Sequence, residues 1–171
     1  IHLKGHFACM RAASVPMREQ RNGSIIAITS HVGLYGLPDS PNYCAAKAGI
    51  MGFTRSLAYE LAHDGITVNS INPGPIETPL LLGLPRDWLE RKKAELPIGR
   101  FGRVNEVAPT ALLLASEEGS YFVGASLNMN GGDPSLEYIA AMAQPMDSFL
   151  ELFAGQGQAS FQLGNRWVEA S

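Results

Sequence analysis

Apolar residues recur at helix spacing and at strand spacing in turn along most of the chain. Residues 1 to about 18 carry Leu3, Phe7 and Met10 at intervals of three to four, which predicts a helix with one apolar face. Residues 24–29 form a short run of apolar and β-branched residues, and residues 66–72 and 126–130 repeat that pattern. Such runs are typical of parallel strands covered on both faces. The pattern therefore predicts three strands, the first two of them buried.

The connection between the first two expected strands carries helix start and stop signals. A loop is expected over residues 31–42. Within it, Ser40 followed by Pro41 predicts a helix start, with serine as the N-cap and proline at the first helical position. Gly65 predicts that this helix ends after about His63.

Two further helices are expected between the second and third strands. One lies near residues 86–94, and the other is predicted to begin at an Asn105 cap and to run to about Ser116, with Pro109 in its first turn. Strands that alternate with helices predict an α/β fold with a parallel sheet. Beyond it, two weakly amphipathic stretches at 136–142 and 146–153 and a Gly/Gln-rich end give no sign of a second domain.

Composition and charge narrow the function classes. Hydrophobic residues make up 46% and charged residues 17% of the 171 residues, as in an ordinary soluble domain. The net charge is −3 and no basic stripe is present, so no nucleic-acid partner is expected, and Arg91, Lys92 and Lys93 are interpreted as a solvated helix face. No apolar run reaches the roughly 18 residues of a membrane span, so no membrane partner is expected. Cys9 and Cys44 are too few for a disulfide framework, which favours reduced thiols and a cytoplasmic location.

Tyr43 and Lys47 form a candidate acid/base pair. They are four positions apart near the start of the expected helix, so they share one helix face. Tyrosine, with an ordinary pKa of about 10, is a weak base at neutral pH. A lysine ammonium about 4 Å away contributes roughly 4 kcal/mol at an effective dielectric constant of about 20, which favours the tyrosinate. By itself the spacing is also that of an ordinary surface pair, and the surrounding residues decide between the two.

Polar residues follow the ends of two neighbouring strands. Ser30 ends the first strand, thirteen positions before Tyr43. Ligands in open α/β sheets collect at the carboxyl ends of the strands, so Ser30 and the first turn of the Tyr43 helix can converge on one crevice. There the Ser30 hydroxyl can hold a carbonyl or alcohol oxygen while Tyr43 exchanges its proton. The second strand brings the Pro73-Gly74 turn to the same edge, where the turn can lie flat against a planar ring and the Thr78 hydroxyl can bond an amide.

The order and spacing of these motifs resemble the short-chain dehydrogenase/reductase family, especially its 3-oxoacyl-carrier-protein-reductase-like members. The matching stretches are 25–30, 43–47, 65–74, 99–103, 106–108 and 130–132. The resemblance implies a Rossmann-like, doubly wound parallel α/β fold, with residues 1–132 as its C-terminal part and residues 133–171 as an extension of unknown role. It also implies NAD or NADP as the cofactor, a ketone or alcohol substrate, 3-oxoacyl compounds included, and a homodimer or homotetramer.

The resemblance assigns the reaction to four residues. Tyr43 would be the general acid/base, and Ser30 would orient the substrate oxygen. Lys47 would hold the ribose hydroxyls next to the nicotinamide and favour ionised Tyr43. His2 stands where the family usually has an asparagine that completes a proton relay through water, and histidine can also donate and accept.

The resemblance also assigns residues to the cofactor. Pro73 and Gly74 would flank the nicotinamide ring, while the Ile76 backbone and Thr78 would meet its carboxamide. The Gly-rich phosphate loop of the family is expected before Ile1, so we expect this sequence to be the C-terminal portion of a reductase. The alternative is a truncated, non-catalytic homologue that acts as an assembly module with intact subunits.

Two other chemistries fit the sequence less well. His2 and His6 share a helix face, but the residues between them lack the glutamate of zinc peptidases, so no metal site is expected. Ser30 and His31 are adjacent, and neighbours in an extended segment point to opposite sides. Because no Gly-x-Ser-x-Gly turn surrounds Ser30 either, a hydrolase is not favoured.

Overall fold

The computed structural model describes residues 2–133, 159–163 and 166–170, which fall into two units, Ile1–Pro134 and Ser135–Ser171. In the first unit, β1 (Gly23–Ile28), β2 (Ile66–Pro73) and β3 (Ser126–Met129) form a parallel sheet in the order β1-β2-β3. β2 lies in the middle and is buried along most of its length, because strands pair with it on both edges. The prediction of three strands in a parallel α/β sheet is confirmed.

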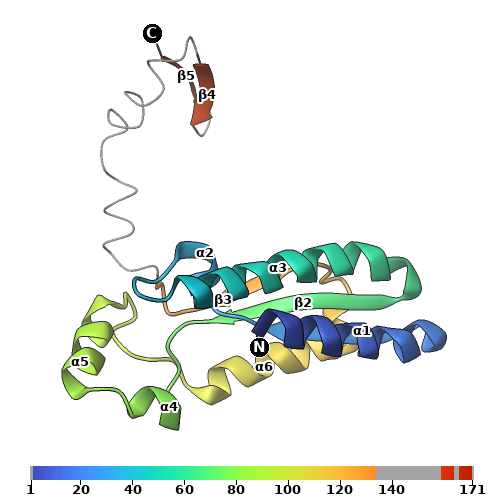
Figure 1. Ribbon diagram of the computed structural model, residues 1–171, viewed down its shortest axis with the longest axis horizontal. Helices are drawn as coiled ribbons and strands as arrows, with labels where there is room; N and C mark the ends of the chain where they lie inside the picture. The colour runs from blue at the N-terminus through green and yellow to red at the C-terminus, as the bar shows by residue number, and fades with distance from the viewer. Residues whose placement is uncertain (1, 134–158, 164–165, 171) are drawn as a thin grey trace. The chain divides into compact units, whose positions relative to one another are not determined.

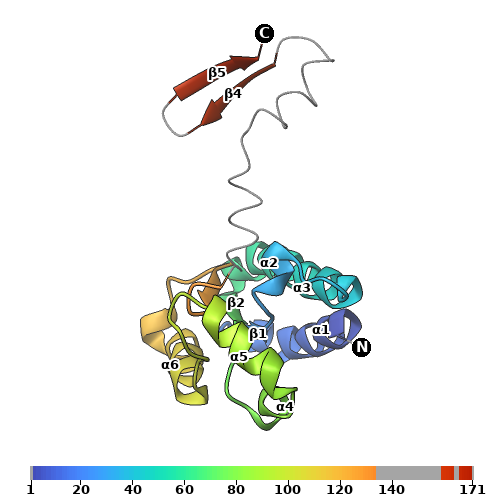
Figure 2. The same ribbon diagram turned by 90° about the vertical axis from the view of Figure 1, so that its left-hand side faces the viewer.

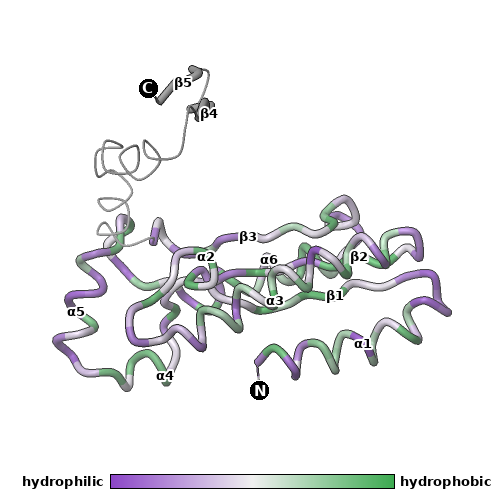
Figure 3. The backbone as a smooth tube through the Cα atoms, turned by 45° about the horizontal axis from the view of Figure 1, so that its top comes forward, coloured by the Kyte–Doolittle hydropathy of each residue, from purple (hydrophilic) through white to green (hydrophobic). Residues whose placement is uncertain are grey.

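Helices cover both faces of this sheet. α1 (His2–Gln20) and α3 (Pro41–Leu61) lie on one face and α6 (Val104–Ala115) lies on the other (Figures 1 and 2). Figure 3 shows hydrophobic residues concentrated along β1 and β2, whereas the outlying α5 is largely hydrophilic. Apolar side chains of α1, α3, β1 and β2 form one buried cluster, made of Met10, Ile25, Ala27, Ile50, Leu57, Ala58, Leu61, Ile66 and Val68.

Three short elements gather where β1 and β2 end. They are α2 (Val32–Tyr35), α4 (Pro79–Leu82) and α5 (Arg86–Glu95), at the left-hand end of Figure 1. The segment expected to be a loop over residues 31–42 thus contains one helical turn. A Cβ on Gly33 would lie 2.8 Å from the Ala48 backbone nitrogen, so α2 sits directly on α3 only because residue 33 has no side chain.

The helix ends differ from the sequence expectations in two places. α3 starts at Pro41 as expected, but the Ser40 side chain makes no capping hydrogen bond, and a short 3₁₀ turn (Ala62–Asp64) follows α3 before Gly65 reverses the chain at φ 74°. The expectation of an Asn105 cap on α6 is wrong. The Glu106 carboxylate accepts the Arg103 N–H at 2.8 Å, so the helix starts two residues earlier, with Arg103 at its N-cap and Pro109 inside it.

The second unit contains an antiparallel pair that the sequence analysis did not identify. β4 (Ala159–Leu163) pairs with β5 (Arg166–Ala170), with Ala159 opposite Ala170 and Leu163 opposite Arg166. The sequence does hold a signal for it, because a Gly-Asn dipeptide separates two short segments that contain aromatic and β-branched residues. The amphipathic stretches noted at 136–142 and 146–153 lie outside the described residues.

Within the described residues, no helix combines the length and the apolar character that crossing a bilayer requires.

Candidate functional site

Ser30 follows β1 at the carboxyl edge of the sheet. The Thr29 N–H donates to the Ile71 carbonyl at 2.8 Å and extends the pairing of β1 with β2 up to this point. Ser30 is buried, and its hydroxyl oxygen is 3.5 Å from the Val32 N–H, which is a weak contact. The Ser30 hydroxyl therefore lies just after the end of β1, and Val32 makes only a weak hydrogen bond to it.

Tyr43 and Lys47 lie in the first turns of α3, above the end of β1. The Lys47 ammonium is 5.5 Å from the centre of the Tyr43 ring and donates to the Ile28 carbonyl at 3.2 Å. Lys47 is buried, and this loss of hydration lowers the pKa of its ammonium from the ordinary value. The backbone of β1 thus fixes the lysine, and the lysine faces the tyrosine ring.

His2 reaches the same place from the first turn of α1. Its ring meets the Tyr43 ring edge-on, with the ring centres 5.6 Å apart and an angle of 83° between the planes. His2 is exposed to solvent, and its backbone carbonyl is 2.8 Å from Nδ1 of His6. Because α1 packs along α3, residues 41 positions apart in the sequence lie side by side.

The turn after β2 is held closely against the end of β3. The Gly74 N–H donates to the Met129 carbonyl at 2.9 Å. A Cβ on Gly74 would lie 2.7 Å from the Cα of Asn130, so only glycine allows the two backbones to approach this closely. The turn is joined to the end of β1 as well, because the His31 N–H donates to the Pro73 carbonyl at 3.3 Å.

Ile76 and Thr78 continue the same segment. Ile76 forms an isolated parallel bridge with Gly102, in which the Glu77 N–H and the Pro75 carbonyl make the hydrogen bonds. The N–H and carbonyl of Ile76 itself therefore point away from Gly102. The Thr78 oxygen accepts the Leu81 N–H at 3.3 Å and caps α4, which leaves the hydroxyl proton of Thr78 free to be donated elsewhere.

A cavity of about 400 Å³ borders this turn. Pro75 and Ile76 form one of its walls, and Gly131 and Gly132 form another. Its volume falls in the range of small-molecule sites, which is about 300–1,000 Å³. Groups of three or more His, Cys, Asp or Glu side chains arranged to hold a metal ion do not occur among the described residues.

The structure thus brings most of the expected site residues to one edge of the sheet. His2 and Lys47 each contact the Tyr43 ring, and Lys47 donates a hydrogen bond to the last residue of β1, two positions before Ser30. Pro73 is connected to the residue after Ser30. Beyond Pro73 and Gly74, Ile76 forms a bridge with Gly102 and Thr78 caps α4.

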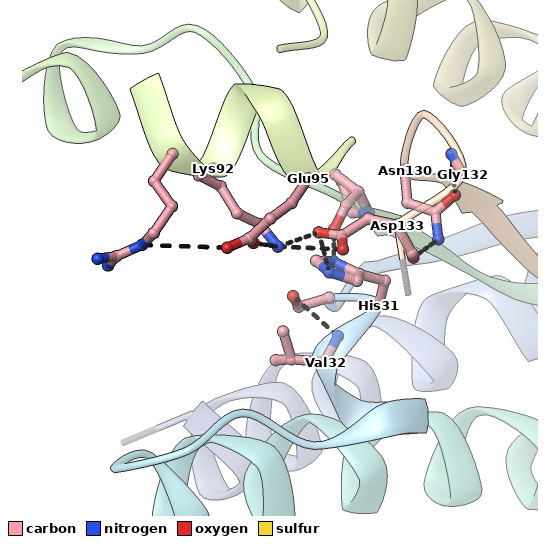
Figure 4. A network of polar contacts seen from close by, with 10 residues as sticks. His31, Val32, Lys92, Glu95, Asn130, Gly132 and Asp133 are labelled. Carbon is pink, nitrogen blue, oxygen red and sulfur yellow. Dashed lines mark hydrogen bonds and ion pairs between the residues drawn. The ribbon is translucent and has the colours of Figure 1, made fainter. Parts of the chain in front are cut away.

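A polar network beside this group was missed by the sequence analysis. In Figure 4, His31 lies next to Asp133, and Asp133 also meets Lys92 of α5. His31 Nδ1 is 3.0 Å from the Pro73 carbonyl oxygen, and His31 Nε2 is 3.0 Å from Asp133 Oδ2. Lys92 Nζ donates to Asp133 Oδ1 at 3.1 Å and is 3.3 Å from Glu95 Oε2.

The interpretation of Lys92 as part of a solvated helix face is therefore wrong. Its side chain is only 17% exposed and pairs with Asp133, which is 1% exposed. Burial raises the pKa of the Asp133 carboxyl, but the contacts with His31 and Lys92 lower that pKa by more, so it lies below its ordinary value. The sequence signal for this network was His31, which directly follows Ser30 at the expected strand end. The other two members, Lys92 and Asp133, are about 60 and 100 residues away in the sequence.

Comparisons with known proteins agree with this geometry. A family model described as "Enoyl-(Acyl carrier protein) reductase" matches residues 1–133. The 3-oxoacyl-(acyl-carrier-protein) reductase FabG of Thermotoga maritima is 45% identical over 132 residues, which are 77% of this chain and 54% of that relative. The protein of the same name from Staphylococcus aureus strain Mu50 is 41% identical over 131 residues, 77% of this chain and 53% of that relative. The chain spans about half the length of the curated relatives it matches.

Proposed function

The chain belongs to the short-chain dehydrogenase/reductase family, and we propose that the intact protein is an NAD(P)-dependent oxidoreductase that interconverts a secondary alcohol and a ketone. The observation that carries the proposal is the contact of His2, Tyr43 and Lys47 beside the end of β1. The names of its relatives support a 3-oxoacyl compound as the ketone.

Tyr43 and Ser30 act on the substrate oxygen. In the direction of reduction, the Ser30 hydroxyl donates a hydrogen bond to the carbonyl oxygen, and the phenol proton of Tyr43 moves to that oxygen as it becomes an alcohol. The positive charge of Lys47, 5.5 Å from the ring centre, stabilises the phenolate that remains. His2 contacts the Tyr43 ring and is exposed, so it can pass a proton from solvent toward Tyr43.

The residues present fit a nicotinamide cofactor. In the part of the chain that the structure describes, Lys47 uses one of its three N–H groups on the Ile28 carbonyl, and the other two suit ribose hydroxyls. The Pro73-Gly74 turn offers a flat backbone surface, and the N–H and carbonyl of Ile76 with the Thr78 hydroxyl offer the donors and acceptor that a carboxamide needs. The cofactor supplies the hydride, and the protein supplies position and electrostatics.

Turnover by the intact protein tests this function. We expect NADH or NADPH to be oxidised in the presence of at least one member of a panel of ketones that includes 3-oxoacyl thioesters, with the matching alcohol as the product. The loss of nicotinamide absorbance and chromatography of the product measure the two halves of the reaction. Absence of turnover with every ketone and both cofactors would contradict the proposal and favour the non-catalytic assembly module.

Replacing Lys47 with methionine tests the role of its charge. Methionine keeps most of the length of the side chain but donates no hydrogen bond, so we expect the cofactor KM to rise about tenfold or more. The pH profile of turnover should also move toward higher pH, because the phenolate of Tyr43 loses its neighbouring cation. Steady-state kinetics across a pH series measure both effects. Lys4→Met, at an exposed position of α1, is the control, and an unchanged profile in Lys47→Met refutes the assigned role.

We also propose that the protein forms a homodimer or homotetramer through the outer surface of α1 and α3. Leu3 and Phe7 are 43% and 48% exposed there, and a Cβ on Gly52 would meet nothing within 4 Å, which leaves room for another helix. Sedimentation of the intact protein as a monomer would contradict the assembly.

A cytoplasmic location is in keeping with the free thiols of Cys9 and Cys44.

A further inference from the structure

His31 connects the Pro73-Gly74 turn after β2 with Asp133 after β3. Its Nδ1 and its backbone N–H both lie against the Pro73 carbonyl, at 3.0 and 3.3 Å, and its Nε2 is 3.0 Å from Asp133 Oδ2. We propose that His31 is a positioning residue: it fixes the Pro73-Gly74 turn with one ring nitrogen and, through Asp133 and Lys92, holds α5 with the other. This proposal rests on the proposed function, in which that turn receives the nicotinamide.

The ring of His31 meets an acceptor on each side. One partner is a backbone carbonyl oxygen and the other is a carboxylate oxygen, so neither can donate a proton to the ring. A doubly protonated imidazole donates to both at once, whereas a neutral ring can donate to only one of them. The His31 side chain is 12% exposed and that of Asp133 is 2% exposed, so little water competes for either contact.

Asp133 is itself held by the turn in which it lies. Its N–H donates to the Asn130 carbonyl at 3.1 Å, and its own carbonyl accepts the Asn130 side-chain amide. Asp133 Oδ2 lies 3.0 Å from both His31 Nε2 and Lys92 Nζ, and neither contact has the geometry of a well-directed hydrogen bond. The carboxylate is thus a fixed point between the His31 ring and the Lys92 ammonium.

The same turn also contacts the chain that leaves α5. The Ile98 N–H donates to the Gly131 carbonyl at 3.2 Å. A Cβ on Gly132 would lie 2.8 Å from the Pro97 ring, so the segment after α5 is packed directly on the turn. Lys92 on α5 and Pro97 after it are therefore both anchored at the end of β3, and His31, the residue next to Ser30, connects that anchor point to Pro73.

α5 lies in the connection between β2 and α6, the connection that begins with the Pro73-Gly74 turn. A helix at the carboxyl edge of the sheet borders the space in which a substrate of this fold binds. The His31 contacts therefore couple the position of the substrate-side helix to the position of the turn that faces the nicotinamide. Loss of one contact should affect binding of one reactant more than the chemical step.

Two isosteric substitutions separate the two contacts of His31. Asparagine places its side-chain amide near the position of Nδ1, so His31→Asn keeps the contact with Pro73 and loses Asp133. Glutamine places its amide near the position of Nε2, so His31→Gln keeps Asp133 and loses the side-chain contact with Pro73. Exposed His63, changed to Gln, is the control.

We expect His31→Gln to raise the cofactor KM of the intact protein about tenfold and His31→Asn to raise the substrate KM by a similar factor. The kcat of both variants should stay within about threefold of the parent, because Tyr43, Lys47 and Ser30 are untouched. His31→Phe, which has no donor, should raise both KM values. Equal changes of both KM values in the Asn and Gln variants, or no change in either, overturn the proposal.

Hydrogen exchange of α5 tests the inference without turnover. Amide exchange over Arg86–Glu95 should become faster in His31→Asn and in Lys92→Met, and should remain near the parent rate in His31→Gln. Lys92→Met leaves the catalytic edge intact and serves if a His31 variant does not fold. Unchanged exchange in Lys92→Met and His31→Asn refutes the inference, whereas faster exchange in a protein without turnover refutes only the proposed function.

Discussion

Replacing Tyr43 with phenylalanine is expected to lower the kcat of the intact protein about 10²- to 10⁴-fold, the range that loss of a positioned general acid/base produces. Phenylalanine keeps the ring, so the edge-on contact with His2 and the contact with the Lys47 ammonium remain possible. What disappears is the proton that the substrate oxygen must receive or give up. The substrate KM should change much less than kcat, because the lost interaction develops during the reaction itself.

Tyr59→Phe is the matched control for this experiment. Tyr59 lies on the same helix, is 80% exposed and takes no part in the site, so its loss should leave kcat near the parent value. Circular dichroism and thermal unfolding of both variants establish that the fold is kept. Turnover of Tyr43→Phe within about tenfold of the parent would mean that another group moves the proton, and the assignment of Tyr43 would be wrong.

Asp133→Asn should lower the free energy of unfolding by about 3 kcal/mol at neutral pH, the size of effect seen when one partner of a buried ion pair is removed. Asp133 is 1% exposed, and its carboxylate neutralises Lys92 and bonds His31. An amide of the same shape leaves the partly buried Lys92 ammonium with Glu95, at 3.3 Å, as its remaining counter-charge in the network. Denaturant titration of the parent and the variant measures the difference.

This difference should depend on pH in a definite direction. The pKa of Asp133 in the folded chain lies below its ordinary value, because the contacts with His31 and Lys92 outweigh the opposing effect of burial. A carboxylate with a depressed pKa stabilises the fold at pH values above its ordinary pKa, and this stabilisation is lost as the pH falls through the folded pKa. The gap between the parent and Asp133→Asn should therefore shrink in acid. Asp87→Asn, at an exposed position of α5, should leave stability nearly unchanged, and a gap of constant size down to acid pH would show that charge is not the cause.

The elements that position the site were readable from local patterns. Apolar and β-branched residues recur in β1, β2 and β3, and this local pattern predicts strands of a parallel sheet. β2 is buried along most of its length, whereas β3 is only partly buried. Tyr43 and Lys47 share a helix face because of their spacing along α3. The meeting of Ser30 with the Tyr43 helix follows from the rule that parallel strands end at one edge.

The exact helix ends depend on which of several nearby polar groups makes the capping hydrogen bond, and the sequence does not reveal this. Ser40 stands at the N-cap of α3 but makes no capping bond there, while Glu106 satisfies the Arg103 N–H and starts α6 ahead of Asn105. Thr78, expected to meet a ligand amide, also caps α4. Capping energies of about 1 kcal/mol are small enough for tertiary contacts to override them.

The sequence by itself determined the parallel α/β sheet, the helix that carries Tyr43 and Lys47, and the placement of Ser30 directly after the first strand, because hydrophobic periodicity and strand polarity are local properties. Only the tertiary structure decided that His31, Lys92 and Asp133 form one buried network. In the sequence, each of these residues is an ordinary polar residue. Their pairing depends on where three segments that are distant in the sequence come together in the fold. Two opposite charges interact strongly only after folding has removed the water around them and brought them close together.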